Sequence, residues 1–147
     1  MNQRPIEYLS QFDVLQIRTK LAATLHTSFE ELNLSALQSA LAAPRQSMFG
    51  EELRPTIWDK AAVLLLLLIK NHPFYDGNKR IALSAVNEFL RRNGWDLTLD
   101  LAQATPFTTT IAAGRADTHA IITWLQSHTQ RIEPVSNRTR SSARTEN

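Results

Sequence analysis

Ala61–Ile69 reads AAVLLLLLI, a run of nine residues that would be apolar on every face of a helix. A helix without a polar face belongs in a protein core, and nine residues are far fewer than the roughly 20 that cross a bilayer. Thr56 and Asp59, just before the run, have the spacing of a helix cap. The helix should end near His72, because Pro73 disfavours helical geometry in the preceding residue and has no backbone N–H. The run therefore predicts a helix through the middle of a soluble domain.

Asn71–Arg80, with the sequence NHPFYDGNKR, follows the apolar run directly. Asp76 and Gly77 are turn residues, and Gly77 can adopt a positive φ or let a ligand approach the backbone closely. Apolar residues recur with the helical period between Ala82 and Leu90, so a second helix is expected from about Asn78. The segment is thus predicted to be a turn between two central helices.

The turn delivers four residues to the N-terminus of the second helix: Gly77, Asn78, Lys79 and Arg80. A helix N-terminus has backbone N–H groups without an intrahelical acceptor and the positive end of the helix dipole, so it favours anions such as phosphate. Two cations in a first turn are unfavourable by the same reasoning. Their presence indicates that a bound anion offsets them, and we predict that these four residues bind phosphate.

Two further side chains of the turn suit a reaction on that phosphate. Asp76 can hold Mg²⁺, which usually takes one or two carboxylates together with phosphate oxygens and water. His72 can accept a proton from an incoming hydroxyl, whereas Phe74 is predicted to anchor the base of the loop. These residues indicate transfer of a phosphorus-containing group from a nucleotide. The alternative is a structural joint whose histidine and asparagine satisfy local backbone groups, and six motif residue types in register favour the nucleotide site.

The stretch HPFYDGNKR resembles the signature of the Fic/Doc family, HPFx(D/E)GN(G/K)R. The flanking sequences, FGEELRPT before the apolar helix and FLRRNGW after the next, are similar to the death-on-curing (Doc) branch of that family. The resemblance extends from Pro5 to Ser127 and is sharpest between Ala43 and Gly94. It implies an all-α, single-domain helical bundle in which the motif loop joins two central helices around a nucleotide site.

Two positions separate this motif from that of the AMP-transferring Fic enzymes. Those enzymes have glycine where this chain has Lys79, and a second arginine where this chain has Leu83. Both differences match the Doc type, so the resemblance implies transfer of the γ-phosphate of ATP to a protein hydroxyl. Gly77 is the residue that Fic enzymes have at its position, and AMP transfer therefore remains the alternative.

The resemblance assigns roles to individual residues. It makes His72 the general base toward the target hydroxyl and Asp76 the ligand of Mg²⁺. The two cations would neutralise charge that develops during transfer. The residues that would bind the phosphate oxygens of ATP are Gly77, Asn78, Lys79 and Arg80.

The resemblance also implies a biological setting. The target would be a hydroxyl of translation elongation factor Tu. The protein would be the toxin of a toxin–antitoxin system, blocking translation unless a Phd-like cognate antitoxin holds it. A non-catalytic module that binds an antitoxin or acts as a corepressor is a further alternative. Arg45–Pro55 is expected to be a flap that positions the target segment.

Composition limits the remaining classes of function. The net charge is only +2, and Arg131–Asn147 carries four arginines against two glutamates, so the folded part is not expected to bind nucleic acid. The chain has no cysteine, and its first ten residues, MNQRPIEYLS, contain no apolar signal core. We expect a cytoplasmic protein without a membrane span. Residues 1–129 are predicted to form the Fic/Doc domain, and residues 130–147 a disordered, polar, arginine-rich tail.

Two helices are predicted before the apolar run. Ser10 and Asp13 can cap the first. Its expected apolar stripe consists of Phe12, Leu15, Ile17, Leu21 and Leu25. Ser35 and Gln38 are predicted to cap the second, which Pro44 closes.

After the motif and its helix, Trp95–Leu101 (WDLTLDL) alternates apolar and polar residues like a strand. No second strand is predicted to pair with it, so we expect an extended segment or part of a small hairpin, and no sheet. Thr105–Ala113 and Asp117–Ser127 are predicted to be the last two helices.

Overall fold

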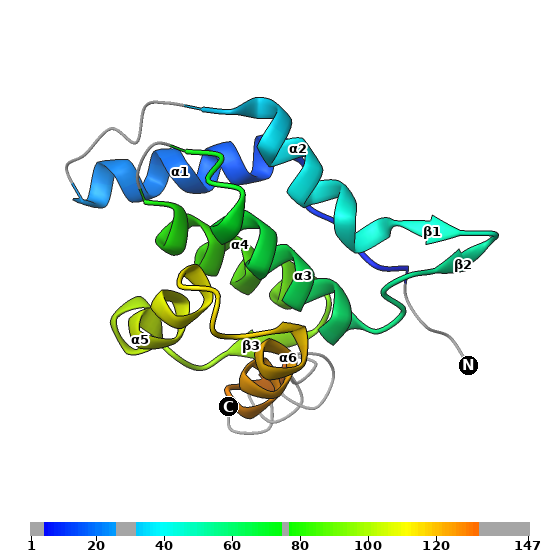
Figure 1. The fold of residues 1–147 in the computed structure, drawn as a ribbon. Helices are drawn as coiled ribbons and strands as arrows, with labels where there is room; N and C mark the ends of the chain where they lie inside the picture. Colours follow the sequence, from blue (N-terminus) through cyan, green and yellow to red (C-terminus); the bar gives the residue numbers. More distant parts are fainter. Residues whose placement is uncertain (1–4, 26–31, 75–76, 133–147) are drawn as a thin grey trace, which may run out of the picture.

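The computed structural model describes residues 5–25, 32–74 and 77–132 (Figure 1). These residues contain six α-helices and two antiparallel two-stranded sheets. The helices are α1 (Gln11–Leu25), α2 (Leu34–Ala42), α3 (Ile57–Lys70), α4 (Asn78–Arg92), α5 (Leu101–Ala112) and α6 (Thr118–Ser127), with a 3₁₀ turn, η1 (Ala43–Arg45), after α2. The strands are β1 (Ser47–Met48), β2 (Glu51–Glu52), β3 (Trp95–Leu97) and β4 (Thr129–Arg131). The predicted all-α fold is confirmed, with two small sheets added to it.

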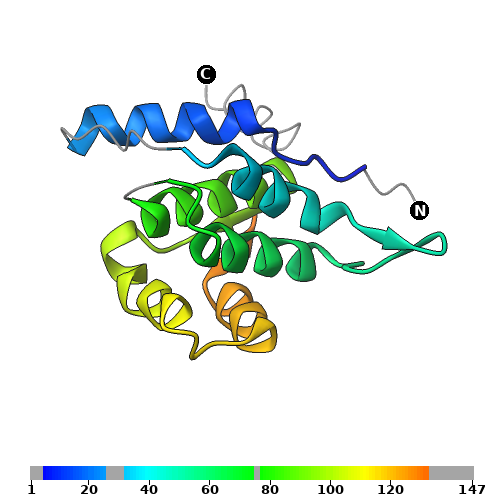
Figure 2. The ribbon, with the colours of Figure 1, turned by 45° about the horizontal axis from the view of Figure 1, so that its top comes forward.

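The helices α3 and α4 form a central pair that the other helices cover from two sides (Figure 2). In one outer layer α1 packs on α4 and α2 packs on α3. From the opposite side α5 packs on both central helices and α6 packs on α3. The motif loop therefore joins the two innermost helices of the domain, as predicted.

The central helix α3 begins where its cap predicts. Thr56 Oγ1 accepts the Asp59 N–H at 3.0 Å, and the Asp59 carboxylate accepts the Thr56 N–H at 3.2 Å. The stretch Ala61–Leu65 is buried, as are Leu68 and Ile69. Each fully buried leucine or isoleucine contributes about 1.5–3 kcal/mol. This burial holds α3 in the core and thereby fixes the position of the motif that follows it.

Lys60 is a charged residue in the buried part of α3, with 1% of its surface exposed. Its Nζ donates to the Pro44 carbonyl at 3.3 Å, to the Arg54 carbonyl and to the Glu52 carboxylate. Each of its three ammonium hydrogens therefore has an acceptor. Pro44 precedes the β1–β2 hairpin, whereas Glu52 and Arg54 lie at its end. The lysine thus fastens both sides of the hairpin to α3.

Ser10 and Asp13 cap α1 as predicted. Ser10 Oγ accepts the Asp13 N–H at 3.2 Å, and the Asp13 carboxylate accepts the Ser10 N–H at 2.7 Å. Phe12 is 70% exposed, so its assignment to the apolar stripe is wrong. The buried side chain near the start of α1 is Val14, and Phe12 lies on the other side because two residues span about 200° of a helix.

The cap of α2 differs from the prediction. Asn33, and not Ser35, is the capping residue, since its Oδ1 accepts the Ala36 N–H at 3.0 Å. The Asn33 N–H itself donates to the Pro73 carbonyl at 2.6 Å. The start of α2 is therefore set by a contact with the motif loop, which is remote in the sequence. Pro44 follows the helix within η1, as predicted.

The strand β3 pairs with β4, with Trp95 opposite Arg131 and Leu97 opposite Thr129. The prediction that no sheet forms here is therefore wrong. Residues 130 and 131, which were predicted to belong to the disordered tail, instead form part of β4. The pairing joins segments about 30 residues apart, so no local turn signal announces it. Residues 133–147 lie outside the described part of the chain.

Both helices after β3 have side-chain caps. Asp100 and Gln103 form a capping box, so α5 starts at Leu101 and not at Thr105. Asp117 caps α6 by accepting the Ala120 N–H at 2.8 Å, as the predicted start of that helix requires. Within the described ranges no helix is both long enough and apolar enough to cross a membrane.

Candidate functional site

The motif loop links the C-terminus of α3 to the N-terminus of α4 (Figure 1). His72, Pro73 and Phe74 are described, as are residues 77–132. Tyr75 and Asp76 lie outside the described residues. The role of Asp76 as a Mg²⁺ ligand therefore stays a prediction.

His72 follows the end of α3 with its side chain exposed. Asn71 closes the helix by donating its N–H to the Leu67 carbonyl at 2.8 Å. His72 then has a φ of 48°, in the left-handed region where helices often end with glycine. For a residue with a Cβ this conformation costs about 1–2 kcal/mol. Strain of this kind is often found at functional sites, and the role of His72 as general base stays a prediction.

The next two residues are fastened to the segment that leads into α2. The Pro73 carbonyl accepts the Asn33 N–H, and Phe74 forms an antiparallel bridge with Leu32. Phe74 is only 3% exposed, which confirms its predicted role as an anchor. The loop is therefore held from the α2 side at its middle residues.

Asn78 is the first residue of α4 and reaches back into the loop. Its Nδ2 donates to the Phe74 carbonyl at 2.7 Å, and its Oδ1 accepts the Phe74 N–H at 3.0 Å. The same Nδ2 lies 3.5 Å from Nδ1 of His72. The side chain thus sets the shape of the loop, and its predicted contact with phosphate stays a prediction.

The N-terminus of α4 differs from those of the other described α-helices. Side chains cap the other five at Ser10, Asn33, Thr56, Asp100 and Asp117. Gly77 occupies the cap position of α4, with φ 78°, and no side chain among the described residues caps this end. The first turn contains no acidic residue, and Lys79 and Arg80 are exposed. The first turn of α4 therefore combines backbone N–H groups with two exposed cations, a donor set that suits an anionic oxygen ligand.

Leu83 is 3% exposed and belongs to the hydrophobic core. It occupies the position where the AMP-transferring pattern has its second arginine. A side chain at this point of α4 faces the interior of the domain. Leu83 therefore offers no polar group to a ligand at this end of the helix.

The segment Arg45–Pro55 forms the β1–β2 hairpin, with Ser47 opposite Glu52 and Met48 opposite Glu51. Phe49 and Gly50 make its two-residue turn with φ values of 53° and 81°, as type I′ hairpins require. The hairpin precedes α3, whereas His72 follows it, and a helix of 14 residues is about 21 Å long. Figure 1 shows the hairpin and the motif loop at opposite ends of α3, so the prediction that this segment is a flap that positions the target at the site is wrong. Among the described residues, Leu32 and Asn33 contact the motif loop.

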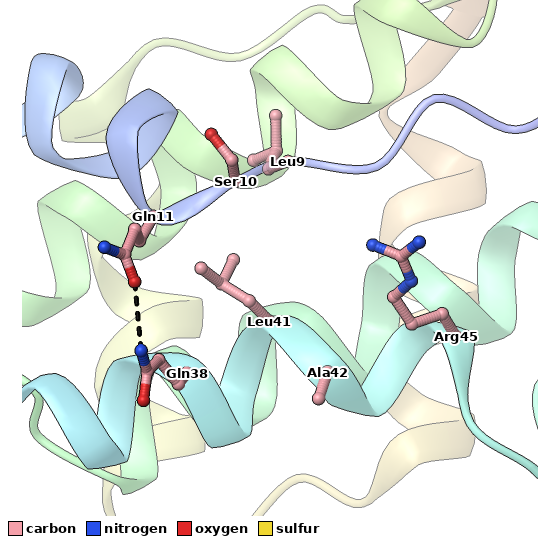
Figure 3. A pocket seen from close by; sticks show the side chains of 7 residues that line it. All are labelled: Leu9, Ser10, Gln11, Gln38, Leu41, Ala42 and Arg45. Atoms are coloured by element: carbon pink, nitrogen blue, oxygen red, sulfur yellow. Dashed lines mark hydrogen bonds between the residues drawn. The ribbon is translucent and has the colours of Figure 1, made fainter.

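A separate groove with a volume of about 250 Å³ lies between the start of α1 and α2 (Figure 3). Leu41 extends from α2 toward the chain at Leu9, and Gln38 Nε2 donates to Gln11 Oε1 at 3.1 Å across one end. None of the predicted site residues lines this groove. It is therefore distinct from the motif loop.

Arg18 of α1 was not predicted from the sequence. Its guanidinium carbon lies 5.7 Å from the centroid of the Phe74 ring. No motif marks this residue, because only the packing of α1 on α4 brings it to the loop.

Comparisons with known proteins agree with this arrangement. The sequence model of the Fic/DOC family matches residues 8–90, which include both central helices up to Leu90 and the whole motif loop. The chain is also 38% identical over 94 residues to the toxin Doc of Mycolicibacterium smegmatis, in an alignment that covers 64% of this chain and 70% of that protein. The chain therefore belongs to the Fic/DOC family.

Proposed function

We propose that this protein is the toxin of a toxin–antitoxin system and that it transfers the γ-phosphate of ATP to a hydroxyl of a target protein. The similarity to the toxin Doc supports the toxin role. The observation that carries the enzymatic role is the start of α4, which lies next to His72 and has two exposed cations. Within the described residues no side chain caps this helix end.

The donor set at this helix end fits a polyphosphate. The backbone N–H groups of the first turn point along the helix axis, and the dipole adds positive potential there. Lys79 and Arg80 supply two full charges, which are unfavourable in this turn without an anion. Gly77 has no Cβ, so the backbone can approach a phosphate group closely. A triphosphate therefore satisfies groups that the protein alone leaves in an unfavourable arrangement.

In the proposed reaction the oxygen of the target hydroxyl attacks the γ-phosphorus of ATP. The bond from this phosphorus to the β–γ bridging oxygen breaks, and ADP leaves. The neutral imidazole of His72 accepts the hydroxyl proton. Lys79, Arg80 and the first-turn N–H groups stabilise charge on the transferred group and on ADP. Asp76 would hold Mg²⁺, which further neutralises phosphate charge when bound.

Two residues favour γ-phosphoryl transfer over AMP transfer. Lys79 adds a cation where the AMP-transferring pattern has glycine, and the buried Leu83 replaces its second arginine. Gly77 is shared with that pattern, so AMP transfer is the alternative product. The two reactions differ in which phosphorus atom of ATP reaches the target.

The target that we propose is translation elongation factor Tu, whose modification would block translation. A Phd-like antitoxin would hold the toxin inactive by covering the motif. The β1–β2 hairpin has no part in this proposal, because about 21 Å of α3 separates it from His72.

Transfer from ATP labelled separately at the α and γ positions tests the reaction. Purified protein with Mg²⁺ is incubated with elongation factor Tu, or with a bacterial lysate, beside a His72→Ala control. We expect label from the γ position alone, dependent on the histidine. Label from the α position would replace the proposal by AMP transfer, and label that persists in His72→Ala would remove the assigned general base.

A further inference from the structure

Arg18 lies on α1, outside the motif, and its guanidinium covers the ring of Phe74. The distance of 5.7 Å from the guanidinium carbon to the ring centroid is within the range of a cation–π interaction. The ring is buried and Arg18 is half-buried, so the contact is partly shielded from water. In the described part of the chain no carboxylate forms an ion pair with Arg18, in contrast to Arg92 and Lys60.

Phe74 is connected to His72 through a second residue as well as through the chain. Both backbone polar groups of Phe74 bond the Asn78 amide, which also approaches Nδ1 of His72 at 3.5 Å. A shift of Phe74 would therefore displace the amide and the imidazole together. Misplacement of a catalytic group by about 1 Å can cost roughly 10²-fold in rate.

We propose that Arg18 is a positioning residue: its cation holds the Phe74 ring against α1 and thereby sets the orientation of Asn78 and His72. This inference rests on the proposed function, because it assigns Arg18 to the same transfer reaction. Arg18 acts through Phe74 and contacts neither ATP nor the target. Through this contact the first helix of the domain contributes to a site that the sequence confines to the motif.

Three variants test the role. Arg18→Met keeps a long apolar side chain on the ring but removes the cation, whereas Arg18→Lys keeps a cation. The matched control is Arg45→Met, because the Arg45 guanidinium carbon lies 4.6 Å from the Tyr8 ring centroid in the same kind of contact. Arg45 belongs to η1, which precedes α3, whereas the motif loop follows α3. The control variant therefore removes a cation–π contact that is remote from the motif loop.

Two measurements are needed. The first is the rate of γ-phosphate transfer to elongation factor Tu as a function of ATP concentration. Arg18→Met is expected to lower kcat roughly tenfold, the range for a partly desolvated cation–π contact. The KM for ATP should stay within about twofold of the wild-type value. The substitution disturbs the orientation of His72 during transfer and not the binding of ATP. Arg18→Lys should recover most of the loss, and Arg45→Met should match the wild type.

The second measurement is hydrogen exchange at the Phe74 amide, which bonds to Asn78 Oδ1. Arg18→Met should speed this exchange and Arg45→Met should not. A raised KM with unchanged kcat would overturn the proposal, because Arg18 would then bind ATP itself. Unchanged exchange at Phe74 would overturn it equally. If the wild type modifies no target, the proposed function fails, and the exchange result still decides whether Arg18 holds Phe74.

Discussion

The side chain of Asn78 bonds the backbone of Phe74 at both ends of its amide, with Nδ2 2.7 Å from the Phe74 carbonyl and Oδ1 3.0 Å from the Phe74 nitrogen. This pair of hydrogen bonds closes the motif loop onto the first residue of α4. Phe74 and the start of α4, which carries Lys79 and Arg80, are therefore held in one fixed arrangement.

Asn78→Asp should break this arrangement more severely than Asn78→Ala. The aspartate keeps an acceptor for the Phe74 N–H. It also places a charged oxygen against the Phe74 carbonyl, which in the wild type accepts a hydrogen bond from Asn78 Nδ2. We expect a loss of about 1–3 kcal/mol in unfolding free energy and a fall of roughly 10² in the transfer rate. Urea unfolding and transfer kinetics check this. An aspartate variant as active as the wild type would show that the two bonds do not hold the loop.

His72→Gly should separate the stability of the loop from its chemistry. Glycine adopts a φ near 48° without steric strain, so the unfolding free energy should stay unchanged or rise by up to about 1 kcal/mol while transfer is lost. His72→Ala removes the imidazole but keeps the strain. Thermal unfolding of the two variants should therefore rank glycine above alanine. The reverse order would mean that the left-handed conformation is not strained.

Lys79→Ala and Arg80→Ala should each lower the transfer rate by roughly 10²–10³. Without ATP, either variant should be more stable than the wild type by about 0.3–1 kcal/mol, because a cation leaves the positive end of the dipole. Transfer kinetics measure the first effect, and thermal unfolding with and without ATP measures the second. The control is Arg91→Ala, since Arg91 is exposed in the last turn of the same helix. An undiminished stabilisation by ATP in both variants would contradict phosphate binding at this end.

Asp13 should make the fold sensitive to acid. Its carboxylate joins α1 to α4 by accepting bonds from Arg92 at 3.0 and 3.3 Å. Burial alone would raise the pKa of Asp13, but hydrogen bonds from Ser10 and Arg92 outweigh it and lower the pKa below 3.8. The ionised carboxylate therefore contributes stability that is present above pH 3.8 and is lost as the pH falls through the lowered native pKa.

Asp13→Asn should accordingly be less stable than the wild type at neutral pH. The difference should shrink at a pH below the lowered native pKa of Asp13, where the wild-type carboxylate becomes protonated in the folded protein. Urea unfolding of the two proteins at both pH values measures the gap. A gap that does not change with pH would show that the charge of Asp13 is not what joins the two helices.

The central part of the fold could be predicted because its signals are local. Thr56 and Asp59 mark the start of α3, and Pro73 disfavours helix in the residue before it. The start of α4 at Asn78 was predicted from the apolar residues that recur with the helical period after it. The motif itself carries the resemblance, so the location of the candidate site did not depend on the tertiary structure.

The start of α5 was missed although its capping box, Asp100 and Gln103, is local. Other features were missed because they depend on contacts between segments distant in the sequence. Asn33, which caps α2, donates its N–H to the Pro73 carbonyl. The strand β3 pairs with β4, which follows α6. Lys60 is buried in α3, where its ammonium group donates to three acceptors. No sequence pattern indicates that these acceptors surround it. Arg18 reaches Phe74 only because α1 packs on α4. Local patterns cannot report such contacts.

The most direct test of the central claim is the intact mass of purified elongation factor Tu after incubation with this protein, ATP and Mg²⁺. The account predicts a gain of one phosphoryl group that is absent with His72→Ala. A gain of an AMP group, or an unchanged mass with the wild-type protein, would contradict it.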